Sequence, residues 1–211
     1  MSECSSGYYF DGVDDKELLD GLRSGDEKAF RQLVTQNHRS MVRVARYYVG
    51  TDTSAEDCVQ ETWMAVLRGI DRFEGRSSLK TWLFHIVANQ ARTLARREGR
   101  VVPTDFTDDL VTVNRALFDE NGMWRDPPTA SNKSLIEVVA DANFVARVKK
   151  AIDQLAEPLR TVVTLRDVEG LPTNEVAKIL ELTEGYVRVI LHRGRARVRN
   201  TVQDHHRGGA T

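Results

Sequence analysis

The feature that most limits the fold of this chain is a helical repeat of apolar residues, which runs through two blocks and stops between them. Leu33, Met41 and Val44 in the first block, and Val148 and Ile152 in the second, recur at separations that match the turn of an α-helix. No stretch alternates apolar and polar residues as a half-buried strand does. The pattern therefore predicts an all-α chain with two small helical domains.

The first block, residues 27–100, reads as three amphipathic helices with short connections. We expect one helix from Ala29 to a stop at Gly50, one over 55–70 with Ser54 as its N-cap, and one over 79–97. Leu67 is expected on the buried stripe of the second of these helices. Residues 1–26 are expected to form a tail and a short helix over 14–22.

The second block, residues 143–202, reads as four helices and is followed by a short tail, 203–211. The helices are expected over 144–157, 159–170, 176–180 and 184–202. A short helix, a tight turn over 181–183 and a longer helix describe a helix-turn-helix. Thr183 is the expected N-cap of its second helix.

Between the blocks, residues 101–142 lose the helical repeat and are rich in Pro, Asp, Asn and Thr. We interpret them as a long acidic linker between two domains. The linker also contains apolar residues such as Phe106 and Trp124, which are available for a partner. Segments of this length without regular structure are usually functional or disordered.

The formal net charge of −1 hides a strongly uneven distribution. Net charge is −5 over 1–26, +5 over 27–100, −5 over 101–142 and +4 over 143–211. Two basic blocks separated by acidic stretches indicate two modules that face a polyanion. Ordinary scatter of surface charge is the alternative.

Several classes of protein are excluded at this stage. No apolar run approaches the roughly 18 residues needed to cross a bilayer, and the N-terminus lacks a secretory pattern, so no membrane insertion is expected. Two cysteines, Cys4 and Cys58, fit a reducing compartment and therefore a cytoplasmic protein. The five histidines show no metal-ligand spacing, and neither a phosphate-binding glycine loop nor a nucleophile motif is present. We expect no enzyme, no metal and no cofactor.

Two helix faces carry residues suited to DNA. The expected helix over 79–97 places Lys80, His85, Asn89, Arg92 and Arg96 along one side, a pattern that suits single-stranded or melted DNA. The second helix of the helix-turn-helix exposes polar and basic residues, which in such motifs meet base edges and phosphates. These are Glu184, Tyr186, Arg188, His192, Arg193, Arg195, Arg197 and Arg199.

A third face is a polar stripe of Asp57, Gln60 and Glu61 on the expected helix over 55–70. It is either an ordinary solvated face or a protein-docking face.

Two runs carry a family resemblance. Residues 53–98 read TSAEDCVQETWMAVLRGIDRFEGRSSLKTWLFHIVANQARTLARRE and resemble region 2 of the extracytoplasmic-function sigma factors of the sigma-70 family. Residues 155–199 read LAEPLRTVVTLRDVEGLPTNEVAKILELTEGYVRVILHRGRARVR and resemble region 4 of the same family. Both occur in the family's order, with 27–100 as region 2, 143–202 as region 4 and a linker between them.

The resemblance implies an alternative sigma factor that binds core RNA polymerase, recognises two promoter elements and promotes DNA melting. Region 2 would dock on the β′ clamp helices through Asp57, Gln60 and Glu61, and the β subunit would also take part. The resemblance further implies an anti-sigma factor as a partner. The loop over 73–78 would enclose a flipped base, which Asn89 would contact.

The site residues that follow from this reading form two sets. For the −10 element they are Phe73, Arg76, Ser77, Ser78, Lys80, His85, Asn89, Arg92, Arg96 and Arg97. For the −35 element they are Thr183, Glu184, Gly185, Tyr186, Arg188, His192, Arg193 and Arg195.

Some positions depart from the family pattern. Pro172 stands where the family usually has a serine, and Glu181 stands where a turn glycine is common. Val189 and Ile190 replace two polar positions of the recognition helix. These departures indicate an altered promoter preference.

The alternative reading is a helix-turn-helix repressor or activator with an N-terminal sensing or dimerisation domain. It accounts for residues 143–202 but leaves the helix with Asn89 without a role.

Overall fold

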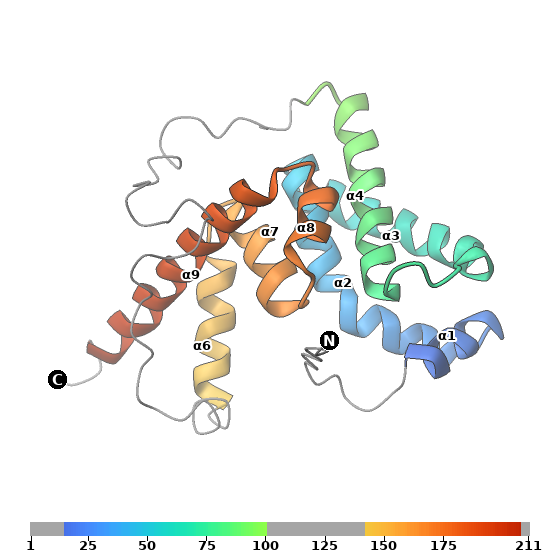
Figure 1. The fold of residues 1–211 in the computed structure, drawn as a ribbon, viewed down its shortest axis with the longest axis horizontal. Helices are drawn as coiled ribbons and strands as arrows, with labels where there is room; N and C mark the ends of the chain where they lie inside the picture. Colours follow the sequence, from blue (N-terminus) through green and yellow to red (C-terminus); the bar gives the residue numbers. More distant parts are fainter. Residues whose placement is uncertain (1–14, 101–141, 208–211) are drawn as a thin grey trace, which may run out of the picture.

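A computed structural model describes residues 15–100 and 142–207 of the chain. Every element in these ranges is helical, which confirms the expected all-α class (Figure 1). The first helical group contains α1 (Asp15–Arg23), α2 (Glu27–Val49), α3 (Asp52–Gly69), the 3-10 turn η1 (Ile70–Arg72) and α4 (Leu79–Arg97). The second contains α6 (Ala142–Asp153), α7 (Leu159–Val163), η3 (Thr164–Val168), α8 (Thr173–Leu180) and α9 (Glu184–Arg207). The predictions for 1–14, 101–141 and 208–211 lie outside the described residues.

Capping residues set the ends of the helices in the first group. Gly50 ends α2 in the left-handed conformation, at φ 78°, as the sequence indicates. Ser78 caps α4 by accepting a hydrogen bond of 3.0 Å from the Thr81 amide. The prediction of Ser54 as the cap of α3 is wrong: Thr51 accepts the hydrogen bond from the Ser54 amide, at 3.2 Å. The helix α3 therefore begins at Asp52, before the expected start at residue 55, because the Thr51 hydroxyl satisfies the Ser54 amide in its first turn.

The core of the first group lies where α2, α3 and α4 meet. Val44, Val59, Leu83 and Phe84 are completely buried there. Cys58 is also buried, and burial raises the pKa of its thiol to about 11, so it is a packing residue and not a nucleophile.

One expected core residue of α3 lies on the surface. The side chain of Leu67 is 45% exposed, and Met64, one turn earlier, is 54% exposed. The prediction that Leu67 belongs to the buried stripe is therefore wrong. It points away from α2 and α4, on the same helix face as the polar stripe.

The second group forms the expected helix-turn-helix. Leu180, Val187 and Leu191 are buried between α8 and α9, and Thr183 accepts a hydrogen bond of 3.2 Å from the Tyr186 amide. The helix expected over 159–170 is interrupted, because it changes from α7 to the π-helix η3. In that wider turn the Glu169 amide donates to the Thr164 carbonyl, at 2.9 Å. The helix α9 also continues beyond residue 202, to Arg207.

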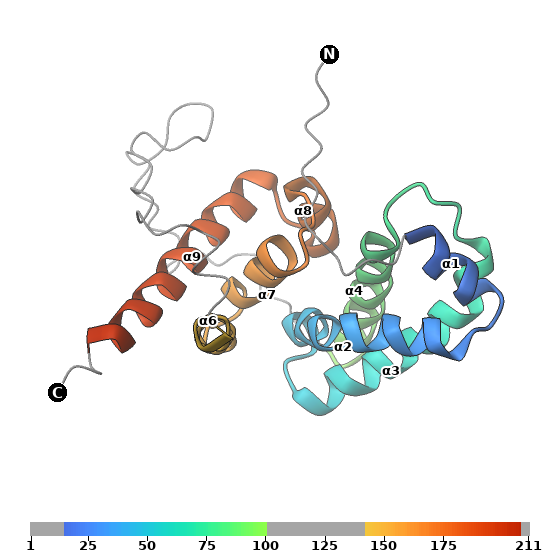
Figure 2. The same cartoon turned by 90° about the horizontal axis from the view of Figure 1, so that it is seen from below.

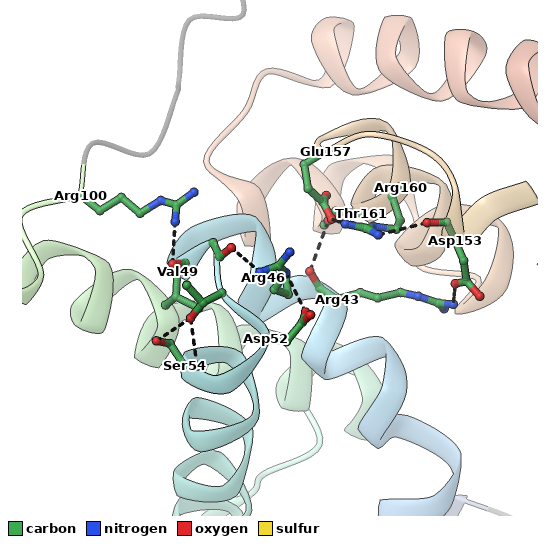
Figure 3. Close-up of polar contacts among 12 residues, drawn as sticks. Arg43, Arg46, Val49, Asp52, Ser54, Arg100, Asp153, Glu157, Arg160 and Thr161 are labelled. Carbon is green, nitrogen blue, oxygen red and sulfur yellow. Dashed lines mark hydrogen bonds and ion pairs between the residues drawn. The ribbon is translucent and has the colours of Figure 1, made fainter. Parts of the chain in front are cut away.

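The two groups lie against each other in both views (Figures 1 and 2). Contacts join α4 to α8 and α2 to both α7 and η3. The guanidinium of Arg43 on α2 pairs with Asp153 at the end of α6, and the Thr161 hydroxyl donates to the Arg43 carbonyl, at 3.5 Å (Figure 3). We did not expect this contact from the sequence, which indicates two bodies joined only by a tether.

Two glycines of α9 give a test of its packing on α7. A Cβ atom at Gly194 would lie 2.4 Å from a methyl group of Val163, whereas a Cβ at Gly185 would meet open space. Gly194→Ala should therefore lower the free energy of unfolding by about 1–3 kcal/mol through overpacking. Gly185→Ala should raise it by up to about 1 kcal/mol through helix propensity. Urea unfolding followed by circular dichroism measures both, and equal stabilisation by the two variants would contradict the packing.

Candidate nucleic-acid interface

The basic side of α4 begins at Lys80 and continues through His85, Asn89 and Arg92 to Arg96. The side chains of Asn89 and Arg96 are exposed, whereas Lys80 and Arg92 are largely covered. Arg92 donates a hydrogen bond to the Asn89 amide oxygen, at 3.1 Å, so the two predicted DNA contacts adjoin on one helix face. The helix thus places a largely covered guanidinium beside an exposed amide that can read a base edge.

A hollow of about 310 Å³ opens beside Asn89, between α3 and α4. Its lining combines hydrogen-bonding groups with an apolar side chain, as a site for a planar base requires. The lining residues are Glu61, Asn89, Gln90, Thr93, Leu94 and Arg97. Asn89 and Arg97 are predicted from the sequence as DNA contacts. The sequence does not show that Glu61 on α3 faces the same hollow.

The loop before α4 has a buried anchor. The ring of Phe73 is 8% exposed and packs on Trp82, with ring centroids 5.1 Å apart. The predicted contact of the Phe73 side chain with DNA is therefore not available in this structure, because burial in the core outweighs exposure of an aromatic ring.

The other loop residues predicted to contact DNA lie on the surface. Arg76, Ser77 and Ser78 are exposed. Arg76 pairs with Glu74 at 2.9 Å, and Ser78 has the additional structural task of capping α4.

Three of the predicted DNA contacts on α4 face carboxylates of the second helical group. Lys80 pairs with Glu169 at 3.0 Å, His85 with Glu175 at 3.4 Å and Arg92 with Glu181 at 3.0 Å. Lys178 donates a hydrogen bond to Glu175 and, together with a bond from His85, lowers the pKa of that carboxyl. These pairs could not be predicted from the sequence, because no local pattern joins residues so far apart in the chain.

The exposed side of α9 begins with Glu184, Gly185 and Arg188. Arg188 forms an ion pair of 2.9 Å with Glu184 one turn earlier, and both side chains are about half exposed. Tyr186 is only partly exposed and packs against the core. The N-terminal turn of α9 is therefore open for contact with DNA.

Farther along α9 the predicted contacts differ in their surroundings. Arg195 donates two hydrogen bonds to Asp167, at 2.6 and 2.8 Å, and this bidentate pair holds α9 against η3. Burial lowers the pKa of His192, and the positive charges of Arg199, Arg193 and Arg195 act in the same direction. Arg193 is partly exposed beside His192.

The departures from the family pattern have visible structural effects. Pro172 precedes α8 without a side-chain cap, as expected when proline replaces serine. Ile190 is 3% exposed and belongs to the core, and Val189 is half-buried, so neither offers a polar contact to DNA. Glu181 occupies the turn at φ 56°, ψ 40°, a left-handed conformation that favours glycine.

The face of α3 that contains Asp57, Gln60 and Glu61 is exposed. Met64 and Leu67 continue the same stripe toward the end of the helix, since the positions differ by three or four residues. Two large apolar side chains exposed side by side on this face add apolar area to the polar stripe, as a protein-docking surface requires.

Other kinds of site find no support in the part of the chain described here. Within residues 15–100 and 142–207, no three His, Cys, Asp or Glu side chains gather in a way that could hold a metal ion. Nor does any helix in those ranges combine the length and apolarity that a membrane span needs.

Comparison with known proteins places both helical groups in families. Residues 33–101 match the model of Sigma-70 region 2, and residues 146–198 match that of Sigma-70, region 4. The chain is 32% identical over 190 residues to the ECF RNA polymerase sigma-E factor of Escherichia coli K12, covering 90% of this chain and 94% of that protein. The sigma-E factor of Haemophilus influenzae is 30% identical over 189 residues, covering 90% and 95%.

Solved structures resemble the chain at lower identity. CnrH in complex with the cytosolic domain of CnrY is 23% identical, with a TM-score of 0.46, and covers 90% of this chain and 97% of that one. The sigma factor RpoE in complex with the anti-sigma factor NepR from Bartonella quintana is 23% identical, with a TM-score of 0.47, over 83% and 98%. On the two family models and the sigma-E relatives together, the chain belongs to the extracytoplasmic-function sigma factors of the sigma-70 family.

Proposed function

We propose that this chain acts as an alternative sigma factor, which binds core RNA polymerase, recognises the −10 and −35 promoter elements and promotes DNA melting. The observation that carries the proposal is the presence of regions 2 and 4, in order, on one chain with DNA-suited faces on α4 and α9. The chain works as an initiation factor without a catalytic step of its own, and in the cytoplasm.

The exposed stripe on α3 is the proposed docking face for the β′ clamp helices of polymerase. Asp57, Gln60 and Glu61 supply polar contacts that fix the register, while Met64 and Leu67 supply apolar area. Charged groups at an interface set the association rate and exclude wrong partners, whereas buried apolar side chains hold the complex together. Met64 and Leu67 extend the set that the sequence identified.

The face of α4 is the proposed site for the non-template strand of the −10 element. Extruding one base costs a few kcal/mol of stacking, which contacts in a pocket must offset. The hollow beside Asn89 supplies such a pocket, and Arg96 and Arg97 are exposed on either side of the helix end to hold phosphates. Lys80 and Arg92 would add further phosphate contacts.

The first turn of α9 is the proposed reader of the −35 element in the major groove, with Glu184 and Arg188 nearest the bases. The buried Ile190 and half-buried Val189 leave this helix with fewer polar contacts than the family pattern. We therefore propose that its promoter preference differs from that of typical members. The anti-sigma factor implied by the family resemblance remains a prediction.

Run-off transcription tests the function directly. Purified chain added to core polymerase should produce defined transcripts from linear genomic DNA, and sequencing their 5′ ends should reveal the two promoter elements. A classical repressor or activator would bind duplex DNA alone and would yield no such transcripts. Absence of any association with core polymerase would contradict the proposal.

Charge reversal should weaken docking at the α3 face. Asp57→Arg with Glu61→Arg should lower the affinity for core polymerase by about tenfold or more, because it replaces complementary with like charges. Pull-down or fluorescence titration with core polymerase measures the change. Glu17→Arg with Asp20→Arg, two exposed positions on α1, is the charge-matched control and should retain parental affinity. Equal loss in both variants would reject this docking face.

Asn89→Ala should separate DNA melting from polymerase binding. Removal of the amide deletes one or two hydrogen bonds to the extruded base, each worth about 0.5–1.5 kcal/mol. We therefore expect open-complex formation, followed by permanganate footprinting, to fall by about twofold to a hundredfold. Polymerase binding should be unchanged, and Asn200→Ala, which removes an exposed amide on α9 outside the proposed site, controls for the loss of a polar group. Unchanged melting would remove Asn89 from the site.

A further inference from the structure

The loop between α3 and α4 is held at its first residue by three contacts. The Phe73 amide donates to the Ile70 carbonyl at 3.1 Å, and the Phe73 ring packs on Trp82. The guanidinium of Arg23 on α1 donates to the Phe73 carbonyl, at 2.6 Å. The amide, the ring and the carbonyl of one residue are therefore all engaged, and Phe73 is the anchor of the loop.

The last residue of the same loop is fixed by α4. The Ser78 side chain accepts a hydrogen bond from the Thr81 amide, and its carbonyl accepts one from the Trp82 amide, both at 3.0 Å. Residues 74–77 lie between these two fixed ends, and all four are exposed. We call them the loop tip. The chain turns within the tip at Gly75, which has a φ of 70°.

The helix that carries Arg23 has a well-defined place on the first helical group. Leu22 is buried, and the Asp26 amide closes the turn into α2 by donating to the Gly21 carbonyl, at 2.9 Å. A Cβ atom at Gly21 would lie 2.9 Å from the Ala29 methyl group, so this glycine lets α1 approach α2 closely. The helix α1 also contacts η1, which leads into the loop (Figures 1 and 2). Packing therefore holds Arg23 beside the start of the loop.

The bond between Arg23 and Phe73 limits the freedom of the loop tip. A hydrogen bond from a charged donor is stronger than one between neutral groups. A segment that is ordered before it binds loses less conformational entropy on binding. The tip contains Arg76 and Ser77, two exposed residues that are predicted to contact the −10 element.

The helix α1 lies outside the part of the chain that identifies region 2. The match to Sigma-70 region 2 begins at residue 33, whereas α1 ends at Arg23. The sequence indicates a short helix here but assigns no task to it. The bond that gives it one joins residues 50 positions apart in the chain.

On the basis of the proposed function, we infer that Arg23 is a positioning residue for the −10 strand: from α1 it holds the Phe73 carbonyl and thereby sets the loop tip in the conformation that contacts DNA. Arg23 acts through Arg76 and Ser77 and does not itself touch the strand. The helix α1 is thus part of the machinery that recognises the promoter.

Arg23→Ala tests this role in the holoenzyme. Without the guanidinium the tip must be ordered at the moment of binding, so open-complex formation should fall by about two- to tenfold. Permanganate footprinting on a promoter identified by run-off transcription measures it, and the affinity for core polymerase should not change. Arg31→Ala removes the same charge from an exposed position on α2 and should match the parent. Equal open-complex formation by the two variants would overturn the inference.

A double-mutant cycle distinguishes positioning from two other roles. Arg76→Ala with Ser77→Ala removes the side chains through which Arg23 is inferred to act. Adding Arg23→Ala to this chain should cause no further loss of open complexes, because the two changes affect one contact. A direct contact of Arg23 with DNA, or a general loss of stability, would act independently and lower open-complex formation by the same factor again. Independent losses would therefore overturn the inference.

Fluorine NMR on the free chain reports on the anchor itself. In protein labelled with 5-fluorotryptophan, the Trp82 resonance is identified by its absence in Trp82→Phe. Arg23→Ala should shift or broaden this resonance, because release of the Phe73 carbonyl loosens the ring that packs on Trp82. Arg31→Ala should leave it unchanged. A Trp82 resonance that Arg23→Ala does not alter would overturn the role of the bond.

Gly21→Leu displaces α1 without changing the charge of the chain. Since even a Cβ atom would lie 2.9 Å from the Ala29 methyl group, the larger side chain must push α1 away from α2 and carry Arg23 with it. We expect about the same loss of open complexes as in Arg23→Ala, and no further loss in the chain that lacks the tip side chains. Open-complex formation equal to that of the parent would overturn the role of α1.

Failure of the inference and failure of the proposed function give different results. If the parent forms no open complex with core polymerase, the sigma function fails and the role of Arg23 fails with it. If the parent opens promoters and Arg23→Ala opens them as well as Arg31→Ala does, the function stands and the inference alone fails.

Discussion

The inner stripe of α2 is the constraint on which the rest of the structure depends. The buried residues Val44 and Ala45 of α2 pack where α3 and α4 meet. Ser40, Arg43 and Tyr48 of the same helix contact the second helical group. Full burial of a Val or Leu side chain contributes about 1.5–3 kcal/mol, whereas an exposed ion pair contributes about 0–1 kcal/mol. Apolar packing therefore holds each group together.

The contacts that join the two groups are of a different kind. Many are hydrogen bonds and ion pairs, such as those of Arg43 with Asp153 and of Lys80 with Glu169. Groups of this kind can exchange one charged partner for another, because a lysine or arginine pairs with a phosphate by the same hydrogen bonds that it makes to a carboxylate. A basic helix face that accepts carboxylates in one state can accept phosphates in another.

The same exchange explains why charge alone is a poor guide to the DNA-binding surface. Arg96 and Arg97 are exposed and ready for phosphates, whereas Arg92 is enclosed by Tyr48 and the end of α8. Arg188 has a surface partner within its own helix, whereas Arg195 is held by two hydrogen bonds to Asp167. Basic residues at helical spacing therefore divide into exposed candidates for DNA contact and residues whose partners belong to the fold.

The amino-acid sequence determined the helices, most of their ends and the helix-turn-helix, because these follow from local spacing and from caps such as Gly50, Ser78 and Thr183. It also identified Asn89 and the polar stripe of α3 as candidate site residues. Local patterns could not show that Phe73 is buried on Trp82, or that Leu67 faces water, since a residue at the edge of an apolar stripe can lie on either side. Only the tertiary structure decided that Glu169, Glu175 and Glu181 lie along α4, because ion pairs between residues about 90 positions apart leave no periodic signal in the chain.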